Sequence, residues 1–417
     1  MNANATASSQ DQPPAAPAPA HMHDSPFLRA PEGARTVFTF TVFALCGPLL
    51  GGLVLFGWRA GLTAALAVAS CVATEALYYR VTRTPAMLGR SHAVLTGVLL
   101  ALTLPAFVPW YVPVIAGAFA IVVGKAVFGG VGHFVWQPAL VGRLAVTVLL
   151  PAALTVADAR FQSRQPVLAQ NRLLIGDVRN AAFGDDIAPW RGRAAPRQAD
   201  AFLLTPPAQV LRGLTDRESP AYGALVFRRA DRLDGPPAAL LQMPPMENLC
   251  YGARPGGLGE TGIILLLVAC LYLTYRNYLK WELPLAMLAA AWATVAVAPI
   301  HLAGPNDTVR TMWLPLLSPE GLDVALTYIH YQLLSGELAL AIVLVSAEMT
   351  SRPVTTGGQV IFGLGCGTLA LILQMYSSVP IPCLMAVLAM NTLTPTIDRF
   401  WRPRVFGTRH FAILRGE

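Results

Sequence analysis

Charged residues are scarce in this chain of 417 residues, where they make up 13% of the total. That is about half of the roughly 25% that is typical of soluble globular proteins. Hydrophobic residues make up 54%, more than a soluble protein hides in one core. These proportions exclude an ordinary soluble enzyme, a disordered protein and a nucleic-acid-binding protein. They favour an all-α polytopic membrane protein that lies in a lipid bilayer.

Cysteine is also scarce, and the six cysteines show no CxxC spacing. Five of them lie inside apolar runs, which indicates small helix residues rather than a disulfide framework. We therefore expect no metal or iron–sulfur site within this chain. A dinucleotide fingerprint is missing too, so nicotinamide or ferredoxin chemistry would have to lie on partner subunits.

Apolar runs, in contrast, are abundant. A helix needs about 20 apolar residues to cross the hydrocarbon core of a bilayer, and the sequence predicts about ten such helices. Their expected ranges are 36–57, 61–79, 92–109, 111–128, 134–153, 261–279, 283–300, 324–347, 358–376 and 379–397. An even number of spans places both termini on the same side of the membrane.

The distribution of Lys and Arg predicts the orientation of these spans. With the start of the chain inside, the inner segments carry fourteen of these residues and the short outer loops carry only Arg59 and Arg310. The positive-inside rule then predicts cytoplasmic termini and a periplasmic or extracellular position for the long polar loop. The predicted parts are a disordered cytoplasmic tail (1–34), a first transmembrane half (35–154), an extracytoplasmic loop domain (155–257), a second transmembrane half (258–398) and a basic cytoplasmic tail (399–417).

A short repeat indicates that the two halves are related. The segment His92–Gly97 resembles His330–Gly336, and each precedes an apolar run that proline interrupts. The two segments belong to the third and eighth spans, which run in opposite directions. We therefore expect two inverted five-helix halves, an arrangement in which transporters build sites near the bilayer midplane.

Ionisable residues inside apolar spans are costly, and they are candidates for functional sites. Arg143 lies well inside the fifth span, and Glu337 and Glu348 lie eleven residues apart on the eighth. On a continuous helix that spacing places both carboxylates on one face, so Glu348 and Glu337 are the candidates for an ion pathway. For Arg143 and Glu348, two interpretations remain equally open: a functional role, in an ion or proton path or a polar wall around a cofactor, and internal salt bridging. For Glu75 and Glu337, a structural role is the favoured interpretation.

Two glycine clusters, Gly124–His133 and Pro255–Thr261, open the fifth and sixth spans. In the first cluster, Gly129 and Gly130 follow Lys125 closely, a combination that is able to cradle an anion at a helix N-terminus. The cluster lacks the spacing of a nucleotide-binding loop. A tight turn is the plainer interpretation.

Four blocks of the sequence together resemble one family. They are Gly124–Gly132 (GKAVFGGVG) with Pro138–Leu140 and Arg143, Gly257–Glu260 (GLGE), Ser346–Thr355 (SAEMTSRPVT) and Arg402–Gly407 (RPRVFG). In order and spacing they resemble the NqrB membrane component of the sodium-pumping NADH:quinone oxidoreductase and the related RnfD component of Rnf complexes. The resemblance covers roughly residues 92–407, and its last block is similar to the Rnf branch.

The resemblance implies a flavin-carrying membrane subunit of a multi-subunit electron transport complex in the bacterial inner membrane. Such a complex couples redox chemistry to Na⁺ or H⁺ translocation, and the subunit is not catalytic alone. Its partners are the other membrane and peripheral subunits, and quinone is a further candidate. Members carry one FMN esterified to a threonine and a second, non-covalent flavin among the helices. Gly129, Gly130 and Arg143 are the candidate residues for cofactor binding within the membrane.

Thr205 is the candidate for the FMN-bearing threonine, because it lies in the outer loop and precedes Pro206. The chain departs from the family there, since Leu203 and Leu204 replace the small residues that usually precede the threonine. It also has Gln137 in place of an asparagine and Glu348 in place of an aspartate, which retains the acid. The alternative function is a solute channel or transporter, or a structural membrane subunit that has lost the covalent flavin.

Overall fold

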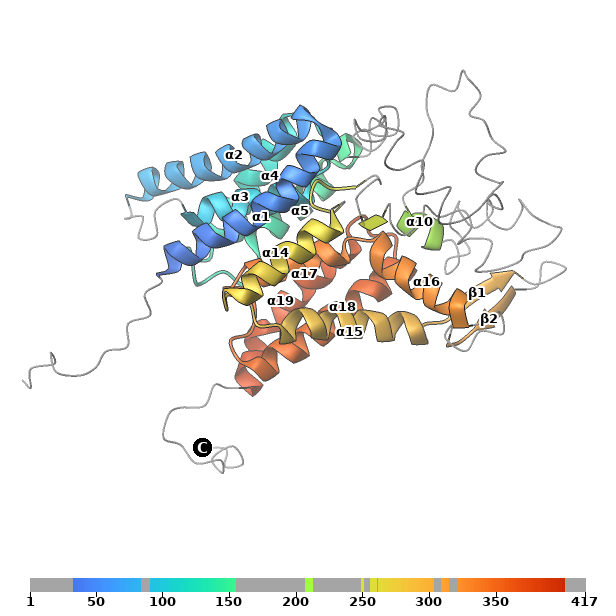
Figure 1. Ribbon diagram of the computed structural model, residues 1–417. Coiled ribbons are helices and arrows are strands. Elements are labelled where there is room, and N and C mark those ends of the chain that lie inside the picture. Colours follow the sequence, from blue (N-terminus) through green and yellow to red (C-terminus); the bar gives the residue numbers. More distant parts are fainter. Residues whose placement is uncertain are drawn as a thin grey trace, which may run out of the picture. The chain divides into compact units, whose positions relative to one another are not determined.

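The computed structural model describes residues 33–83, 91–154, 207–212, 249–250, 256–260, 262–303, 309–314 and 322–401. Helices dominate these segments (Figure 1). In the first half they are α1 (Ala34–Phe56), α2 (Trp58–Thr82), α3 (Ser91–Thr103), α4 (Tyr111–Ile121), the π-helix η1 (Val122–Ala126) and α5 (Pro138–Leu149). In the second half they are α14 (Ile263–Tyr275), α15 (Glu282–Val297), α16 (Leu322–Ser335), α17 (Leu338–Ala347), α18 (Thr356–Tyr376) and α19 (Pro382–Phe400).

Three of these helices, α1, α2 and α18, are long and apolar enough to cross a membrane unaided. The pair α16 and α17 forms a fourth candidate span, which is bent by 51° at its break. Five other predicted spans coincide with shorter apolar helices, α3, α4 with η1, α5, α14 and α15. The tenth predicted span coincides with α19.

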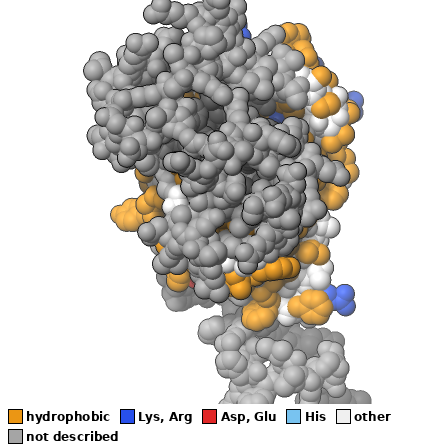
Figure 2. Space-filling model, turned by 90° about the vertical axis from the view of Figure 1, so that its right-hand side faces the viewer, with side chains coloured by type: hydrophobic (Ala, Val, Ile, Leu, Met, Phe, Trp, Pro, Cys, Tyr) orange, Lys and Arg blue, Asp and Glu red, His pale blue; other side chains and the backbone are white. Residues whose placement is uncertain are grey.

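The outward-facing side chains of the helices are largely apolar. Helix α14 exposes Leu267, Val268 and Leu271, and it buries Leu266 and Leu273 on its other side. In Figure 2 the described side chains at the margins of the view are mainly hydrophobic, with only scattered Lys and Arg. Exposed apolar side chains on helices, whose backbone groups are satisfied internally, suit a lipid environment. The described part of the chain therefore has the character of a helical membrane protein.

The eighth predicted span is not one continuous helix. Gly336 and Glu337 occupy the bend between α16 and α17, and Glu348 follows the last residue of α17. Glu337 and Glu348 therefore flank α17, one at each end, and their position on one helix face stays a prediction. Helix α17, with 10 residues, separates them by about 15 Å of helix.

Side chains from a neighbouring helix stabilise this bend. The amide nitrogen Nε2 of Gln374, on α18, donates a hydrogen bond of 2.8 Å to the backbone carbonyl of Gln332. That bond supplies a donor to a carbonyl at the end of α16, where the helix leaves its last carbonyls without intrahelical partners. Gly336 packs directly on the same amide, so that a Cβ atom at this position would overlap it. A side chain at position 336 would therefore have to displace the Gln374 amide.

The two halves pack their helices in corresponding ways. In the first half α1 packs on α3, α2 on α4, and α4 on α5; in the second half α14 packs on α17, α15 on α18, and α18 on α19. Between the halves, α1 contacts α14, α3 contacts α17, and α5 contacts α19. Figure 1 shows α1 beside α14 at this junction. Each of these three helix pairs therefore joins helices that hold the same place in their own half.

The segment Gly257–Glu260 joins the end of α3 through the backbone. The amide of Leu258 donates to the carbonyl of Leu104 (2.9 Å), and the amide of Gly259 donates to the carbonyl of Leu102 (2.8 Å). Pro105 has no amide hydrogen with which to continue the helix, so these bonds satisfy carbonyls that α3 leaves open. This backbone pairing explains why the third predicted span is helical only as far as Thr103.

A short antiparallel hairpin follows α15 and was not expected from the sequence. It pairs β1 (Ile300–Ala303) with β2 (Val309–Met312), with Ile300 opposite Met312. Of the loop predicted for 155–257, the structure describes α10 (Pro207–Arg212), residues 249–250 and residues 256–257. Helix α10 packs against α16 and α18, so this part of the loop is anchored on the second half.

Candidate functional site

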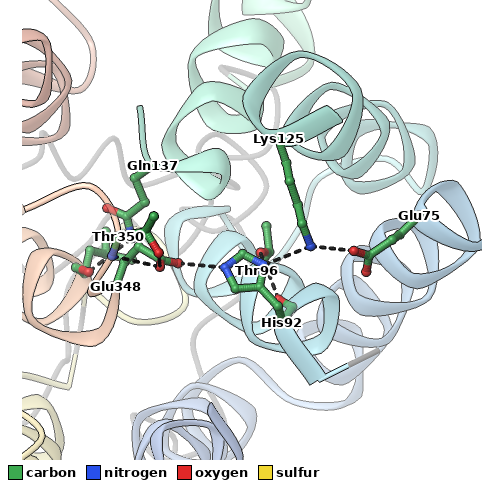
Figure 3. A network of polar contacts seen from close by, with 8 residues as sticks. Glu75, His92, Thr96, Lys125, Gln137, Glu348 and Thr350 are labelled. Atoms are coloured by element: carbon green, nitrogen blue, oxygen red, sulfur yellow. Dashed lines mark hydrogen bonds and ion pairs between the residues drawn. The ribbon is translucent and has the colours of Figure 1, made fainter. Parts of the chain in front are cut away.

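A line of four buried ionisable side chains connects the two halves (Figure 3). Glu75 lies on α2, Lys125 on η1, His92 on α3, and Glu348 directly after α17. The Lys125 ammonium contacts the Glu75 carboxylate and lies 3.1 Å from His92 Nδ1. On the other side of the ring, His92 Nε2 lies 3.3 Å from Glu348 Oε2. None of these residues is more than 3% exposed, so the line, here named the ionisable chain, is shielded from solvent and lipid.

Hydrogen-bond chemistry fixes the protonation pattern at His92. A lysine ammonium has only donors, so a charged Lys125 donates to the lone pair of His92 Nδ1 (3.1 Å). The ring is then neutral, and its hydrogen is on Nε2, facing Glu348. A proton on both ring nitrogens would set two donors against each other unless Lys125 were neutral. The states of Lys125 and His92 are therefore linked.

Aromatic rings enclose the His92 imidazole. The ring of Phe38, on α1, packs edge-on with its centroid 5.1 Å away, and the ring of Phe134 lies 5.5 Å away. Within its own helix, His92 faces the hydroxyl of Thr96, which lies 3.4 Å from Nδ1. These neighbours exclude water from the ring and leave Lys125 and Glu348 as its charged contacts.

The π-helix η1 positions Lys125. The amide of Val127 donates to the carbonyl of Val122 (3.1 Å), five residues earlier, so the chain completes a wider turn than an α-helix at this point. Such a turn rotates the following side chains relative to a regular helix, and π-turns occur frequently at functional sites. Here the wide turn faces Lys125 inward between α2 and α3, where only 2% of it is exposed.

Three glycines allow the helices that carry the ionisable chain to approach closely. A Cβ atom at Gly97 would lie 2.6 Å from Val68 Cα, at Gly117 2.9 Å from Ser70 Cβ, and at Gly124 2.8 Å from Pro138 Cα. These glycines hold α3 against α2, α4 against α2, and η1 against the start of α5. Small residues at helix contacts serve the same purpose in membrane bundles generally.

The Glu348 carboxylate belongs to a loop, residues 348–355, that joins α17 to α18. Its Oε1 accepts a hydrogen bond from the hydroxyl of Thr350 (3.1 Å), while Oε2 faces His92. The two oxygens thus have different partners, one from the same loop and one from the opposite half. Arg352 of this loop is also buried, and its Nη2 donates to the backbone carbonyl of Tyr278 (3.1 Å).

Hydroxyl and amide side chains from α19 and α18 hold the same loop, and an amide from the first half holds the helix before it. The Thr394 hydroxyl of α19 donates to the Ser351 carbonyl (3.1 Å), and Gln359 Nε2 of α18 donates to the Pro353 carbonyl (3.0 Å). From the first half, Gln137 Nε2 donates to the carbonyl of Leu344 on α17 (3.1 Å). Backbone groups of a non-helical segment at membrane depth require such partners, which gives the Ser346–Thr355 block a structural reason.

The other predicted site residues lie at different positions. Arg143 is buried on α5, at 7% exposed, and its own backbone carbonyl accepts a hydrogen bond from Thr147 (2.8 Å). Glu337 is buried at the opposite end of α17 from Glu348. Of the two carboxylates predicted for an ion pathway, Glu348 is thus a member of the ionisable chain as defined above.

Gly129 and Gly130 form a turn directly after η1. Both have positive φ angles, 96° and 102°, a conformation that side chains other than glycine rarely adopt. Nothing lies within 4 Å of a Cβ atom at either position, so backbone conformation rather than crowding accounts for the glycines. Their predicted role in binding a flavin or quinone stays a prediction, and Thr205 lies outside the described residues.

Sequence reasoning missed the link among Glu75, Lys125 and His92. It gave Glu75 a structural role, counted Lys125 among the charges of the inner segments, and used His92 only as a marker of the internal repeat. The structure pairs the buried Lys125 with Glu75, so Lys125 does not belong to a charged loop. An available signal was the presence of each ionisable group within or beside an apolar run.

Comparison with known proteins identifies the family. The model of the NQR2, RnfD, RnfE family matches residues 21–407. This chain belongs to that family. Two of the blocks by which the chain resembles it, Gly124–Gly132 and Ser346–Thr355, carry Lys125 and Glu348 of the ionisable chain.

Members of the family are similar to this chain over nearly their whole length. A component of the ion-translocating oxidoreductase complex of Halorhodospira halophila is 29% identical over 390 residues, which cover 92% of this chain and 94% of the relative. The corresponding component of the Na⁺-translocating ferredoxin:NAD⁺ oxidoreductase complex of Acetobacterium woodii is 27% identical, covering 93% and 95%. That of the proton-translocating ferredoxin:NAD⁺ oxidoreductase complex of Clostridium ljungdahlii is 25% identical, covering 93% and 96%. The names of the last two relatives thus differ in the ion that is translocated, Na⁺ in one and the proton in the other.

Proposed function

We propose that this chain is the RnfD-like membrane component of an electron transport complex that couples ferredoxin:NAD⁺ chemistry to cation translocation across the bacterial inner membrane. Family membership and the names of the relatives support this function. The other subunits of the complex would supply the nicotinamide and ferredoxin sites. This chain would supply part of the path along which the cation moves.

One observation carries the proposal: the contact of His92 with Glu348 across the two halves. The two groups lie 3.3 Å apart and are 0% and 1% exposed. A carboxylate in such an environment is costly unless an opposite charge or a hydrogen bond stabilises it. A purely structural anchor has no need of that cost, whereas a translocating subunit needs a buried group that binds and releases a cation.

We further propose that the chain crosses the membrane ten times as two inverted halves, with cytoplasmic termini and an external loop. The corresponding packing of the two halves supports this arrangement, because the contacts between them pair α1 with α14, α3 with α17, and α5 with α19. A two-fold axis in the membrane plane generates that pattern. In this topology Glu75, Lys125, His92 and Glu348 all lie toward the cytoplasmic ends of their spans.

The flavin is a separate proposal. We propose that FMN is joined through its phosphate to Thr205, on the strength of the family resemblance alone. The chain that follows is anchored, since α10 begins at Pro207 and packs against α16 and α18. A flavin tethered there would supply one-electron redox chemistry on the external side of the second half. The leucines at positions 203 and 204 are the evidence against it.

The function is tested with the complex purified from its native host and reconstituted in vesicles. Reduced ferredoxin and NAD⁺ drive turnover, and a potential-sensitive dye reports net charge movement. We expect wild type to build a potential, and Glu348→Gln to reduce it at least about tenfold while the complex assembles normally. Glu260→Gln is the matched control, because a glutamine oxygen can still accept the 2.6 Å hydrogen bond from the Gly257 amide.

Two outcomes would overturn the proposed function. One is a wild-type complex that transfers electrons without building a potential, as expected if the chain were a solute channel or a structural subunit. The other is Glu348→Gln behaving like Glu260→Gln, which would separate Glu348 from cation movement.

A further inference from the structure

We propose that the ionisable chain is a proton relay between the two halves, and that the cation moved by this component is therefore H⁺ rather than Na⁺. This inference rests on the proposed function and specifies its ion. It assigns roles to three residues outside the predicted ion pathway, Glu75, His92 and Lys125. In the proposed topology the relay is the cytoplasmic-side segment of the path.

Protein groups already occupy the positions beside the two carboxylates. Lys125 contacts Glu75, and His92 lies 3.3 Å from Glu348. A metal cation bound at Glu75 would have to displace the ammonium or lie next to it in a poorly screened interior, where like charges repel strongly. A proton needs no vacant coordination site, because it passes between groups that already lie close together, Lys125 and His92 at 3.1 Å and His92 and Glu348 at 3.3 Å.

The contacts also form a continuous series of groups that exchange protons. The relay has two links: Lys125 Nζ to His92 Nδ1 at 3.1 Å and His92 Nε2 to Glu348 Oε2 at 3.3 Å. Glu75 is hydrogen-bonded to Lys125 at the far end. Proton transfer between side chains requires heavy atoms within hydrogen-bond reach. Imidazole suits the central position, since its two nitrogens face opposite directions.

The transfer balances in atoms and charge. Lys125 gives a proton to His92 Nδ1, the resulting imidazolium gives its Nε2 proton to Glu348, and Glu348 becomes a neutral acid. Lys125, now a neutral amine, is reprotonated by a proton arriving through Glu75. The His92 hydrogen then lies on Nδ1 and must return to Nε2 before the next transfer. One proton has entered at Glu75, and one has arrived at Glu348.

The surroundings keep the proton within this series. The other ionisable side chains near the two carboxylates are Tyr79 and Cys71 beside Glu75 on α2, and Arg352 in the loop of Glu348. The Arg352 guanidinium is not a proton carrier, because arginine is not deprotonated in proteins. Phe38 and Phe134 close the sides of His92.

Lys125→Arg provides the decisive variant. Arginine keeps the positive charge beside Glu75 but cannot become the neutral amine that the relay requires. If Lys125 has only a static structural role, Lys125→Arg should translocate nearly as well as wild type. If Lys125 carries protons, Lys125→Arg should lose translocation. His92→Gln is the second variant, because an amide keeps hydrogen bonds but does not relay a proton, and His330→Gln on the exposed side of α16 is its control.

The experiment uses the reconstituted complex in two parallel assays, a pH-sensitive dye in Na⁺-free buffer and uptake of radioactive Na⁺. We expect wild type and His330→Gln to move protons without Na⁺. Lys125→Arg and His92→Gln should lower proton movement at least tenfold, and both should assemble with the other subunits. If Lys125→Arg fails to assemble, His92→Gln gives the answer alone.

The outcomes separate the relay from the proposed function. Wild type that takes up radioactive Na⁺ and moves no protons in Na⁺-free buffer would overturn the relay and leave the proposed function standing. Proton movement at the wild-type rate in assembled His92→Gln or Lys125→Arg would also overturn the relay. Wild type that transfers electrons but moves neither ion would overturn the proposed function itself.

Discussion

The ion pair between Lys125 and Glu75 predicts a specific loss of stability in Lys125→Met. Methionine has a similar volume, so the main effect is to leave the Glu75 carboxylate, which is 3% exposed, without its ammonium partner. Removing one member of a buried ion pair costs about 3–5 kcal/mol, which lowers the ratio of folded to unfolded protein roughly a hundredfold or more. The double variant Lys125→Met/Glu75→Leu should regain at least half of the loss, because apolar groups replace the whole pair.

The measurement follows unfolding of this chain within the detergent-solubilised complex. Cys71, Cys366 and Cys383 are fully buried, so a thiol-reactive dye labels them only as the chain unfolds, and labelling along a denaturant series gives the free energy of unfolding. Lys280→Met is the matched control, because Lys280 is exposed and contacts only Thr356 among its described hydrogen bonds. The control should change stability by no more than about 0.5 kcal/mol. Equal stability of Lys125→Met and Lys280→Met would refute the reasoning.

Three further predictions test other parts of the structure. Gly97→Ala should destabilise the chain by roughly 1–3 kcal/mol through overpacking, since the added Cβ would lie 2.6 Å from Val68 Cα. Gly47→Ala is its control in the same thiol assay and should be neutral or stabilising, because no atom lies within 4 Å of a Cβ added there. A Thr205→Ala chain from the native host should lose the flavin fluorescence that wild type shows in a denaturing gel, and a dark wild type would contradict covalent attachment. A single cysteine at Ser219, in a cysteine-free background, should react with impermeant reagent only from the external side; reaction from the cytoplasm alone would reverse the proposed topology.

The helices themselves were largely predictable from the sequence. Apolar runs locate α1, α2 and α18 closely, because length and composition alone decide whether a helix suits a bilayer. The break between α16 and α17 was not predicted, although Gly336 marked it. The break packs against Gln374, 38 residues further along the chain than Gly336, a contact that sequence periodicity does not reveal. The β1–β2 hairpin was missed because its strands have only four residues each.

The candidate site was predictable only in part. Glu348 was a candidate because a carboxylate beside an apolar run is conspicuous, and the structure buries it where the two halves meet. Its partner was not identifiable, because His92 lies 256 positions earlier in the chain and meets Glu348 only through the packing of α3 on α17. Likewise, only the wide turn of η1 places Lys125 between Glu75 and His92. Tertiary geometry, rather than local pattern, chooses the partners.

The coupling of His92 to Glu348 is the central claim, and a double-mutant cycle of translocation tests it most directly. Proton movement per electron is measured in vesicles for wild type, His92→Gln, Glu348→Gln and the double variant. If both residues serve one path, each single change abolishes most of the proton movement. The double variant then moves as many protons per electron as the less active of the two single variants. If the two residues acted independently, the losses would multiply, and that result would contradict a shared path through the 3.3 Å contact.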